Sequence, residues 1–468
     1  GKLILVSNRL PVHVDIKSDN TVQFRSSAGG LATALNGFHK DHSGSLWVGW
    51  PGVIPPEHRE EVKNRLLTEY GCYPVFLEED LVEKFYDGFS NNTLWPLFHS
   101  FPAYTRYLDS EWEAYKEANE MFAKAILEVA SSGDCVWIHD FHIMLLPKIL
   151  REAMSDLVIG FFLHIPFPSY DIFRLMPWAS EITEALLRSD LVGFHTYDYV
   201  QNFLAVVRRS LGIDNNLGVI VRDQLVCHVD VFPIGIDFNK FNLATEHPAT
   251  QVEMEKIKKR HDGQKIIFAV SRLDYTKGII ESLHAFETLL VTQPQYQKKV
   301  VFVLVVVPSR ERVKRYASLK KEIDESVGRI NSKYGSFEWH PVLYLFQSLT
   351  FAELTAYYSR ADVGLVIPSR DGMNLVAKEY LATKKDAAGV LVLSEMAGSA
   401  KELQEALLVN PNSKREVVEA LDYALTMPLE EQTRRNEPMR SRLEEYDTTR
   451  WGNSFLDRLD KARDARKE

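Results

Sequence analysis

Short apolar runs, each closed by polar residues or proline, recur along the chain. Runs of this length that are rich in valine, isoleucine and aromatic residues are typical of buried strands. Segments of helix-forming residues lie between them, among them residues 112–130 and 181–188. Alternation of strands and helices predicts a parallel, doubly wound sheet. In the first half of the chain the predicted strands are residues 2–6, 46–50, 136–140, 159–163, 191–195 and 229–232.

The character of the chain changes near residue 237. Residues 239–263 are polar and include a charge-rich run at 253–259, which predicts a connection between two domains and the place of a hinge. A second alternating series follows, and a charged segment with apolar spacing at 442–460 predicts a closing helix. Because 468 residues exceed what one core usually organises, we expect two domains. The strands predicted in the second series are residues 265–271, 300–307, 343–346, 363–367, 390–394 and 407–409.

Composition narrows the classes of function. The chain has 55 Lys and Arg against 64 Asp and Glu, a net charge of −9, which argues against a nucleic acid or an anionic membrane as the main partner. Any phosphate site in this acidic chain must therefore be a local cluster of cations. Three widely spaced cysteines without metal-type pairing indicate a reducing compartment. The sequence shows no signal peptide and no long apolar run, so we expect a cytoplasmic protein.

Polar residues stand where the predicted strands of the first half end. Arg9 follows the first strand, and Asp140, His164 and His195 close later ones. Ligands of open parallel sheets bind outside the carboxyl ends of the strands, so each of these side chains is a candidate for a binding site. Arg9 can equally be a solvated loop arginine, and a single histidine in such a place is often structural.

Two further stretches of the first half are candidates for the binding site because of their composition. Gly29 and Gly30 follow a strand-like run and permit a tight turn close to a phosphate, although the stretch matches neither a Walker loop nor G-x-G-x-x-G. Residues 85–97 carry aromatic residues among glycine and asparagine with little helix periodicity, so we expect a loop. Tyr86 and Trp95 in this loop are candidates for stacking on a sugar, whereas such aromatic residues more often fill a core.

Cations gather at strand ends in the second half. Arg272 and Lys277 follow the strand predicted at 265–271 and stand at the head of a helix predicted at 279–290. Two cations beside a helix N-terminus form a site able to hold a pyrophosphate. Arg310, at the end of the next long strand, adds a third cation. Three strand-end cations in an acidic chain favour a binding function over a solvated surface.

The stretch at residues 369–380 predicts a loop that leads from a strand into a helix. Gly372 lets the backbone approach a ligand, and a helix that begins near Asn374 presents N–H groups to an anion or a sugar hydroxyl. Asp371 and Glu379 add two acceptors, which suits a polyhydroxylated ligand that carries phosphate. The alternative is an ordinary loop, with Asp371 in a turn and Glu379 on a solvated helix face.

Taken together, these stretches resemble the trehalose-6-phosphate synthases of glycosyltransferase family 20, which are retaining glucosyltransferases of the GT-B fold. The matches follow the order of the family along nearly the whole chain, and the pairing of residues 271–278 with residues 370–380 is its specific part. Residues 193–199 are more similar to fungal members than to bacterial ones. The matching stretches are residues 7–11, 28–31, 47–52, 139–147, 164–168, 271–278, 370–380 and 391–399.

The resemblance implies two Rossmann-like α/β domains that face a cleft. Residues 1–237 would bind the acceptor, residues 238–449 would bind the donor, and a helix at about 450–468 would pack back on the first domain. The implied reaction moves glucose from UDP-glucose to the anomeric hydroxyl of glucose 6-phosphate and gives α,α-trehalose 6-phosphate and UDP. No second domain follows Glu468, so we expect a synthase without phosphatase activity.

The resemblance also implies roles for individual residues. Arg272 and Lys277 correspond to the diphosphate-binding pair, and His164 corresponds to the histidine beside the transferred glucose. Arg9 and Arg310 correspond to the residues that bind the 6-phosphate. The other acceptor residues are Tyr86, Trp95 and Asp140. The other donor residues are Gly30 over the phosphates, Leu349 at the uracil, Asp371, Gly372, Met373, Asn374, Leu375 and Val376 at the glucose, and Glu379 at the ribose.

The expected mechanism follows from the candidate catalytic set, which is His164, Asp371, Arg272 and Lys277. A retaining glycosidase needs two carboxylates close together, one of them as nucleophile, and the sequence offers no clear nucleophile. We therefore expect same-face substitution, in which Arg272 and Lys277 stabilise the leaving diphosphate. The sequence has no D-x-D triplet and no His/Cys ligand cluster, so we expect neither a metal nor another cofactor.

Three other interpretations stay open at this stage. A glucosyltransferase with another phosphorylated acceptor would differ in its acceptor residues, and Arg9 and Arg310 specify only the phosphate. A sensor of UDP-glucose or glucose 6-phosphate would lack donor residues, all of which are present here. A dehydrogenase is the weakest alternative, because no G-x-G-x-x-G follows a strand.

We expect no nucleic-acid or membrane partner, and we leave open a homo-oligomer and a complex with a separate trehalose-6-phosphate phosphatase.

Overall fold

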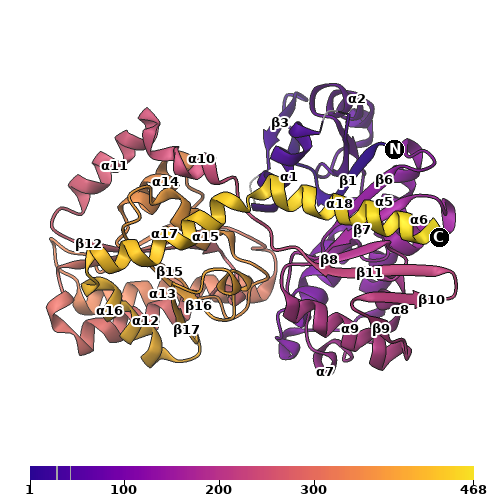
Figure 1. Ribbon diagram of the computed structural model, residues 1–468. Coiled ribbons are helices and arrows are strands. Elements are labelled where there is room, and N and C mark those ends of the chain that lie inside the picture. Colours follow the sequence, from indigo (N-terminus) through magenta and orange to yellow (C-terminus); the bar gives the residue numbers. More distant parts are fainter. Residues whose placement is uncertain (28–29, 43, 468) are drawn as a thin grey trace. The chain divides into compact units, whose positions relative to one another are not determined.

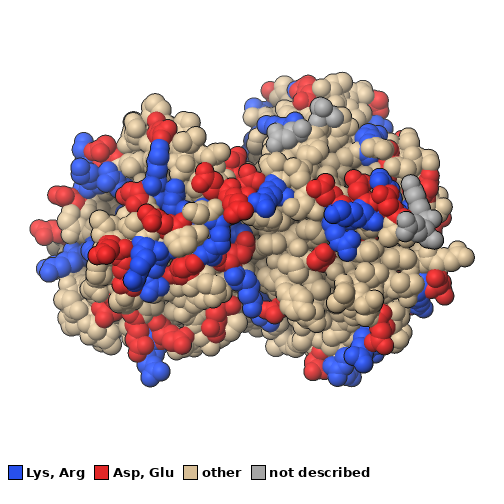
Figure 2. Space-filling model, viewed as in Figure 1, with Lys and Arg blue, Asp and Glu red and all other residues tan. Residues whose placement is uncertain are grey.

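The computed structural model describes residues 1–27, 30–42 and 44–467 (Figure 1). The chain divides into two compact units. Unit 1 consists of Gly1–Ile234 and Thr448–Glu468, and unit 2 consists of Gly235–Asp447. Each unit is built around a largely parallel sheet with helices between successive strands, so the predicted α/β alternation is confirmed. On the face that Figure 2 shows, acidic and basic side chains are interspersed.

The sheet of unit 1 places two strand ends at its topological switch point. From β5 to β11 all strand pairs are parallel, and β1 lies between β4 and β6. The connections that follow β1 and β6 therefore leave in opposite directions, β1 toward β4 and β6 toward β7, and open sheets bind ligands at such a point. Within the described residues the strand order is β5 (Cys72–Pro74), β4 (Leu46–Trp50), β1 (Leu3–Arg9), β6 (Cys135–His139), β7 (Val158–Phe162), β8 (Leu191–Phe194), β11 (Leu225–Val231), β10 (Val219–Arg222), β9 (Asn215–Asn216).

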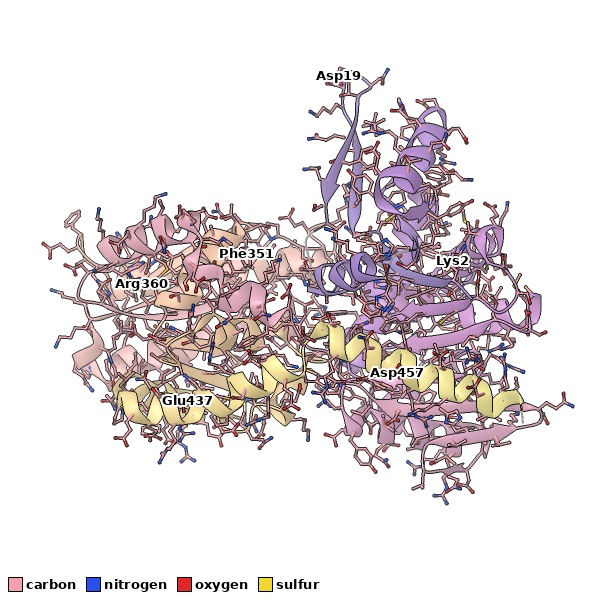
Figure 3. The ribbon with its side chains drawn as sticks, turned by 45° about the horizontal axis from the view of Figure 1, so that its top comes forward. Lys2, Asp19, Phe351, Arg360, Glu437 and Asp457 are labelled. Atoms are coloured by element: carbon pink, nitrogen blue, oxygen red, sulfur yellow. The ribbon has the colours of Figure 1, made fainter. Side chains whose placement is uncertain are left out.

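The last helix of the chain, α18 (Thr448–Lys467), packs on the strands of unit 1 (Figures 1 and 3). Phe455 on this helix stacks on Trp137 of β6, with ring centroids 4.6 Å apart. Gly160 and Gly193 make room for it, because a Cβ at either position would lie 2.7 or 2.8 Å from the Phe455 ring. The helix predicted at 442–460 is thus two helices, α17 (Leu429–Glu445) in unit 2 and α18 in unit 1.

The other elements of unit 1 are a hairpin and helices. The strand-like run that precedes Gly29, residues 21–25, belongs to the hairpin β2 (Val12–Ile16) and β3 (Val22–Ser26), which forms a sheet of its own. The helices surround the large sheet (Figure 1). They are α1 (Gly30–Asp41), α2 (Arg59–Tyr70), α3 (Glu79–Val82), the π-helix η2 (Glu83–Leu94), α4 (Trp95–Phe98), α5 (Asp109–Val129), α6 (Leu146–Ala153), α7 (Tyr170–Phe173), α8 (Ala179–Leu186) and α9 (Tyr197–Leu211).

Unit 2 has a fully parallel sheet with a second switch point between β12 and β15. β13 reads VVFVLVVV and is buried on both faces, as expected for a strand covered by helices on both sides. Within the described residues the strand order is β14 (Val342–Phe346), β13 (Val300–Val307), β12 (Lys265–Arg272), β15 (Val363–Val366), β16 (Val390–Ser394), β17 (Leu407–Val409). Its helices include α12 (Ile279–Thr292), α13 (Lys314–Tyr334), α14 (Phe351–Arg360), α15 (Leu375–Thr383) and α16 (Lys414–Thr426).

The polar stretch at 239–263 is not a connection between domains. It forms α10 (Phe238–Asn242) and α11 (Pro248–Arg260), which belong to unit 2, and α11 packs against α14. Figure 3 marks the ends of α14 with Phe351 and Arg360. Within α11 only Thr250 and Ile257 are buried, so the helix presents polar side chains nearly all round and its sequence resembles a linker.

Candidate active site

The switch point of unit 2 brings Arg272 and Lys277 to the start of α12. Arg272 is the last residue of β12, and Lys277 ends the short turn η6 (Tyr275–Lys277) that follows. Gly278 comes next with φ +69°, and a Cβ there would lie 2.0 Å from the carbonyl oxygen of Ile367. Glycine is therefore needed for the chain to turn this closely over the end of β15. The first turn of α12 directs its N–H groups toward the same edge of the sheet.

Lys277 contacts the loop that was predicted to hold the donor. Its Nζ lies 2.7 Å from Oδ2 of Asp371, and both side chains are largely buried. Asn374 donates from Nδ2 to the same oxygen at 3.1 Å, and its Oδ1 accepts from the N–H of Ala377 as the N-cap of α15. The predicted cation and the predicted loop are thus joined at one carboxylate, beside the N-terminus of a helix.

A segment after β16 supports the loop at residues 371–374 through backbone hydrogen bonds. The N–H of Gly398 donates to the Asp371 carbonyl at 3.1 Å, and the N–H of Ser399 donates to the Met373 carbonyl at 2.8 Å. A Cβ on Gly398 would lie 2.0 Å from the Gly372 carbonyl oxygen. The family resemblance gave residues 391–399 no role in the site. In the structure, Gly398 and Ser399 of this stretch support the backbone of the loop at Asp371 and Met373. Leu375 and Val376 form the first turn of α15, so their N–H groups stand at its N-terminus.

Glu379 lies one turn further along α15 and is partly buried. Tyr358 of α14 donates its hydroxyl to Oε2 of Glu379 at 2.8 Å. Burial raises the pKa of Glu379 to about 7, against the opposing effects of the Tyr358 hydrogen bond and the charge of Lys240. Leu349 lines a cavity of about 200 Å³ between α11, β14 and α14. The other lining residues are Glu253, Lys256, Ile257, Arg260, Leu345, Gln347, Glu353 and Tyr357.

Arg310 lies in unit 2, in the loop after β13, with φ +50°. Its Nη1 donates to the hydroxyl of Tyr316 at 2.8 Å and lies 3.6 Å from Oδ2 of Asp274. Burial alone would raise the pKa of Asp274, but the charges of Arg310, Lys277 and Arg272 hold it below its usual value. The charges of the three predicted strand-end cations therefore all lower the pKa of one buried carboxyl group.

In unit 1, Arg9 lies over two aromatic rings. Its guanidinium carbon is 5.3 Å from the ring centroid of Trp50 and 5.1 Å from that of Tyr86. Tyr86 in turn stacks on His142, with centroids 5.7 Å apart. Trp50 ends β4, the parallel neighbour of β1, so the sheet itself brings it beside Arg9. Trp50 and His142 were not predicted as site residues, although both lie in stretches that matched the family.

Tyr86 and Trp95 belong to helices and not to the predicted loop. Residues Glu83–Leu94 form a π-helix, η2, which continues into α4. Hydrogen bonds from i to i+5 give about four to five residues per turn, so positions nine apart return to one face. At about 3.6 residues per turn an α-helix would place the same two positions on opposite faces. Both side chains accordingly reach the turn at Phe141–Ile143, where Trp95 contacts Phe141 with centroids 5.7 Å apart.

His164 and Asp140 lie together at the carboxyl ends of β7 and β6. Oδ1 of Asp140 accepts from the backbone N–H of His164 at 3.2 Å, and Asp140 has φ +81°. Nε2 of His164 is 3.0 Å from Nδ1 of His139, and the His195 ring centroid is 5.3 Å from that of His164. Burial, with His139 and His195 nearby, lowers the pKa of His164 well below its ordinary value. The His164 imidazole is therefore neutral.

Gly30 was predicted to lie over the phosphates of the donor. Gly30 is the first residue of α1, whereas Ala28 and Gly29 lie outside the described residues. In the described part of the chain no group of three or more His, Cys, Asp or Glu side chains is arranged to hold a metal ion. The same residues contain no helix that is long and apolar enough to cross a bilayer.

The architecture of two Rossmann-like units is that of the GT-B glycosyltransferases, and comparison with known proteins agrees. A structure of an α,α-trehalose-phosphate synthase (UDP-forming) from Burkholderia xenovorans in complex with glucose 6-phosphate is similar, with TM-score 0.88 and 32% identity over 98% of this chain and 100% of that one. A structure described as trehalose-6-phosphate from E. coli bound with UDP-2-fluoro glucose gives TM-score 0.89 and 34% identity over 98% and 99%. The GT-B fold class is thus confirmed.

The model of glycosyltransferase family 20 matches residues 1–461. The chain belongs to this family. A bifunctional trehalose-6-phosphate synthase/phosphatase from Thermoproteus tenax is 46% identical over 100% of this chain, which spans 64% of that relative. An α,α-trehalose-phosphate synthase (UDP-forming) from Aspergillus fumigatus is 42% identical over 98% of this chain and 90% of its own length. The predicted family is therefore confirmed.

Proposed function

We propose that this chain transfers glucose from UDP-glucose to glucose 6-phosphate and releases α,α-trehalose 6-phosphate and UDP. The names of the relatives support this reaction, as do the ligands of the two similar structures. The observation that carries the proposal is the ion pair between Lys277 and Asp371, which joins a phosphate-binding cation to a sugar-binding carboxylate at one switch point.

On the donor side, Arg272 and Lys277 bind the diphosphate of UDP-glucose beside the N-terminus of α12. Asp371 and the backbone amides at the start of α15 bind the hydroxyls of the transferred glucose. Glu379 accepts from the ribose hydroxyls, and Leu349 contacts the uracil at the wall of its cavity. Gly30, at the start of α1, lets the backbone come close to the phosphates.

On the acceptor side, Arg9 and Arg310 bind the 6-phosphate, and Arg9 is already held by its contact with two aromatic rings. Tyr86 and Trp95 pack against the sugar, as aromatic rings do in carbohydrate sites. Asp140 accepts from a sugar hydroxyl and orients the backbone of His164. The neutral His164 imidazole can take part in a hydrogen bond to a sugar hydroxyl.

The proposed route to retention is same-face substitution. The departing phosphate oxygen takes the proton of the acceptor hydroxyl while the glucosyl group passes through an oxocarbenium-like state. Arg272 and Lys277 stabilise the charge that develops on UDP, which is the electrostatic role that a metal fills elsewhere. Asp371 is a poor nucleophile in this site, because Lys277 and Asn374 already occupy its Oδ2. A glucosyl-enzyme trapped on any carboxylate would contradict this mechanism.

The first test measures UDP release from UDP-glucose in EDTA, with and without glucose 6-phosphate. We expect release that depends on glucose 6-phosphate, persists in EDTA and falls by roughly 10²-fold or more in Arg310→Ala, because removing a charge-assisted contact costs about 2–4 kcal/mol. Arg312→Ala is the matched control, since Arg312 is exposed in the same loop. Binding of either substrate without turnover would instead indicate a sensor.

The name of the Thermoproteus tenax relative suggests one partner for this reaction. That relative is described as a synthase and a phosphatase in one chain. We keep as a proposal that trehalose 6-phosphate made here passes to a separate phosphatase. Co-purification of the chain with such an enzyme is the measurement that bears on it.

A further inference from the structure

Arg310 is held in one orientation by groups that the reaction scheme leaves without a role. Its side chain is 5% exposed, and its Nη1 donates to the Tyr316 hydroxyl at 2.8 Å. The same Nη1 is 3.6 Å from Oδ2 of Asp274, and the guanidinium carbon is 5.6 Å from the Tyr316 ring centroid. The backbone at Arg310 has φ +50°, so the loop adopts a conformation that is costly for arginine.

Tyr316 is fixed in turn by the helix and by its neighbours. It lies in the first turn of α13 and is 1% exposed, and its ring is 5.6 Å from that of Tyr275 between centroids. Burial raises the pKa of Tyr316, so its hydroxyl is neutral and can accept from Arg310. The hydroxyl therefore provides a rigid acceptor that does not neutralise the guanidinium.

Asp274 is equally constrained. It is 1% exposed, and its Oδ1 accepts from the N–H of Thr276 at 2.9 Å and from the Thr276 hydroxyl at 2.8 Å. The other oxygen, Oδ2, is left to face Arg310. A carboxylate 3.6 Å from Nη1 compensates the buried charge of the guanidinium.

We propose that Tyr316 and Asp274 are positioning residues that hold Arg310 for the acceptor, and that they thereby set the preference for a phosphorylated sugar over the free sugar. The proposal rests on the phosphate-binding role proposed above for Arg310. The physical reason is preorganisation, because an arginine that is already fixed loses little side-chain entropy when a phosphate binds. Asp274 also neighbours Arg272 and Lys277, so it acts on both substrates, whereas Tyr316 acts on Arg310.

The test is a double-mutant cycle of Tyr316→Phe and Arg310→Ala, with KM measured separately for glucose 6-phosphate and UDP-glucose. We expect Tyr316→Phe to raise KM for glucose 6-phosphate by about five- to tenfold and to leave KM for UDP-glucose unchanged. In the Arg310→Ala background the same change is expected to add nothing, because the contact it removes is already absent. Tyr334→Phe, at the other end of α13, is the matched control.

Each outcome bears on the proposal. An unchanged KM for glucose 6-phosphate in Tyr316→Phe, while Arg310→Ala raises it, would overturn the positioning role and leave the phosphate role intact. Equal effects of Tyr316→Phe in both backgrounds would show a merely structural role. If Arg310→Ala itself leaves this KM unchanged, the proposed phosphate role fails and the positioning role falls with it.

A second variant addresses Asp274 independently. Asp274→Asn keeps the shape of the side chain and its acceptor for Thr276 while removing the charge. We expect it to raise KM for both substrates, since the carboxylate neighbours the cations of both sites. Unchanged KM values for both substrates, in a variant with the melting temperature of the wild type, would overturn the role of Asp274.

Discussion

Lys277 and Asp371 are 94 positions apart in the sequence, yet Nζ of one lies 2.7 Å from Oδ2 of the other. The parallel pairing of β12 with β15 produces this contact, because it sets the loops that follow the two strands side by side. Both side chains are largely buried, so neither charge is strongly solvated. The pair links the leaving group to the transferred sugar in the proposed reaction.

Removing one member of this pair is expected to cost both stability and rate. Lys277→Met leaves the Asp371 carboxylate buried without its cation, which we expect to destabilise unit 2 by about 3 kcal/mol. Activity is expected to fall by about 10²- to 10³-fold, because Lys277 also stabilises the departing diphosphate. Thermal unfolding and UDP release measure the two effects.

The double variant Lys277→Met with Asp371→Asn separates these effects. It removes both charges, so we expect most of the lost stability to return while the activity stays low. A double variant that melts no higher than Lys277→Met would show that the ion pair is not the source of the destabilisation.

Glu379 is expected to make the binding of UDP-glucose depend on pH. Its pKa in the folded protein is raised to about 7 by burial. Only the ionised carboxylate accepts from both ribose hydroxyls, so KM for UDP-glucose should rise by about tenfold as pH falls from about 8 to about 6. Glu379→Gln should remove this dependence, whereas Glu338→Gln, at an exposed position, should retain it.

The raised pKa of Glu379 also predicts how the stability of the fold depends on pH. As pH rises, binding of UDP-glucose should improve, whereas the stability that Glu379 contributes should fall. A carboxyl group whose pKa is raised on folding favours the folded state fully below its unfolded pKa, and the contribution is lost as pH rises through about 7. Glu379→Gln is therefore expected to melt higher than the wild type at pH above about 7 and to lose this advantage toward acid pH. An identical difference in melting temperature at every pH would argue against a raised pKa.

Gly278 is expected to be intolerant of alanine for two separable reasons. Its φ is +69°, and an added Cβ would lie 2.0 Å from the Ile367 carbonyl. Gly263 has nearly the same φ, +70°, but nothing lies within 4 Å of a Cβ there. We expect Gly263→Ala to cost about 1 kcal/mol from the backbone alone and Gly278→Ala to cost about 3 kcal/mol or more. Equal losses of melting temperature would show that the close approach is relieved cheaply.

Asp190 is expected to stabilise unit 1, because its carboxylate contacts both helix α18 and strand β7 of the sheet. Its carboxylate lies 2.9 Å from Arg151 and 3.0 Å from Arg466 on α18, and it accepts from the N–H of Ile159 at 2.8 Å. Asp190→Asn leaves two cations without this carboxylate, so we expect a loss of about 3–5 kcal/mol. Asp214→Asn, which breaks the exposed pair with Arg208, should cost about 1 kcal/mol or less. Chemical denaturation followed by fluorescence compares them.

The parts of the site that lie within one short stretch of the chain were predicted from the sequence of that stretch. Arg272, Lys277 and Gly278 follow a strand and precede a helix, and the structure has them there. The helix that begins beside Asn374 was likewise predicted, since strand, loop and helix succeed one another within a few residues. The assignment of ligands to these residues came from the family resemblance, because a cation at a strand end does not specify which phosphate it binds.

Other elements were predicted wrongly, and each error has a physical source. The sequence predicts a linker at residues 239–263 because α11 buries so few side chains that its apolar period is weak. It predicts a loop at residues 85–97 because a π-helix repeats every four to five residues, a period that neither the helical nor the strand pattern detects.

Only the tertiary structure decided which residues meet. The contacts of Arg9 with Trp50, of Arg310 with Asp274, and of Lys277 with Asp371 depend on which strands pair and in what order. Strand order in a parallel sheet results from packing between segments that are far apart in the chain. Local hydrophobic patterns therefore do not predict the strand order. The sequence alone therefore determined most of the helices and strands and the kinds of side chain at their ends. Strand order and packing within each unit determined which of these side chains meet.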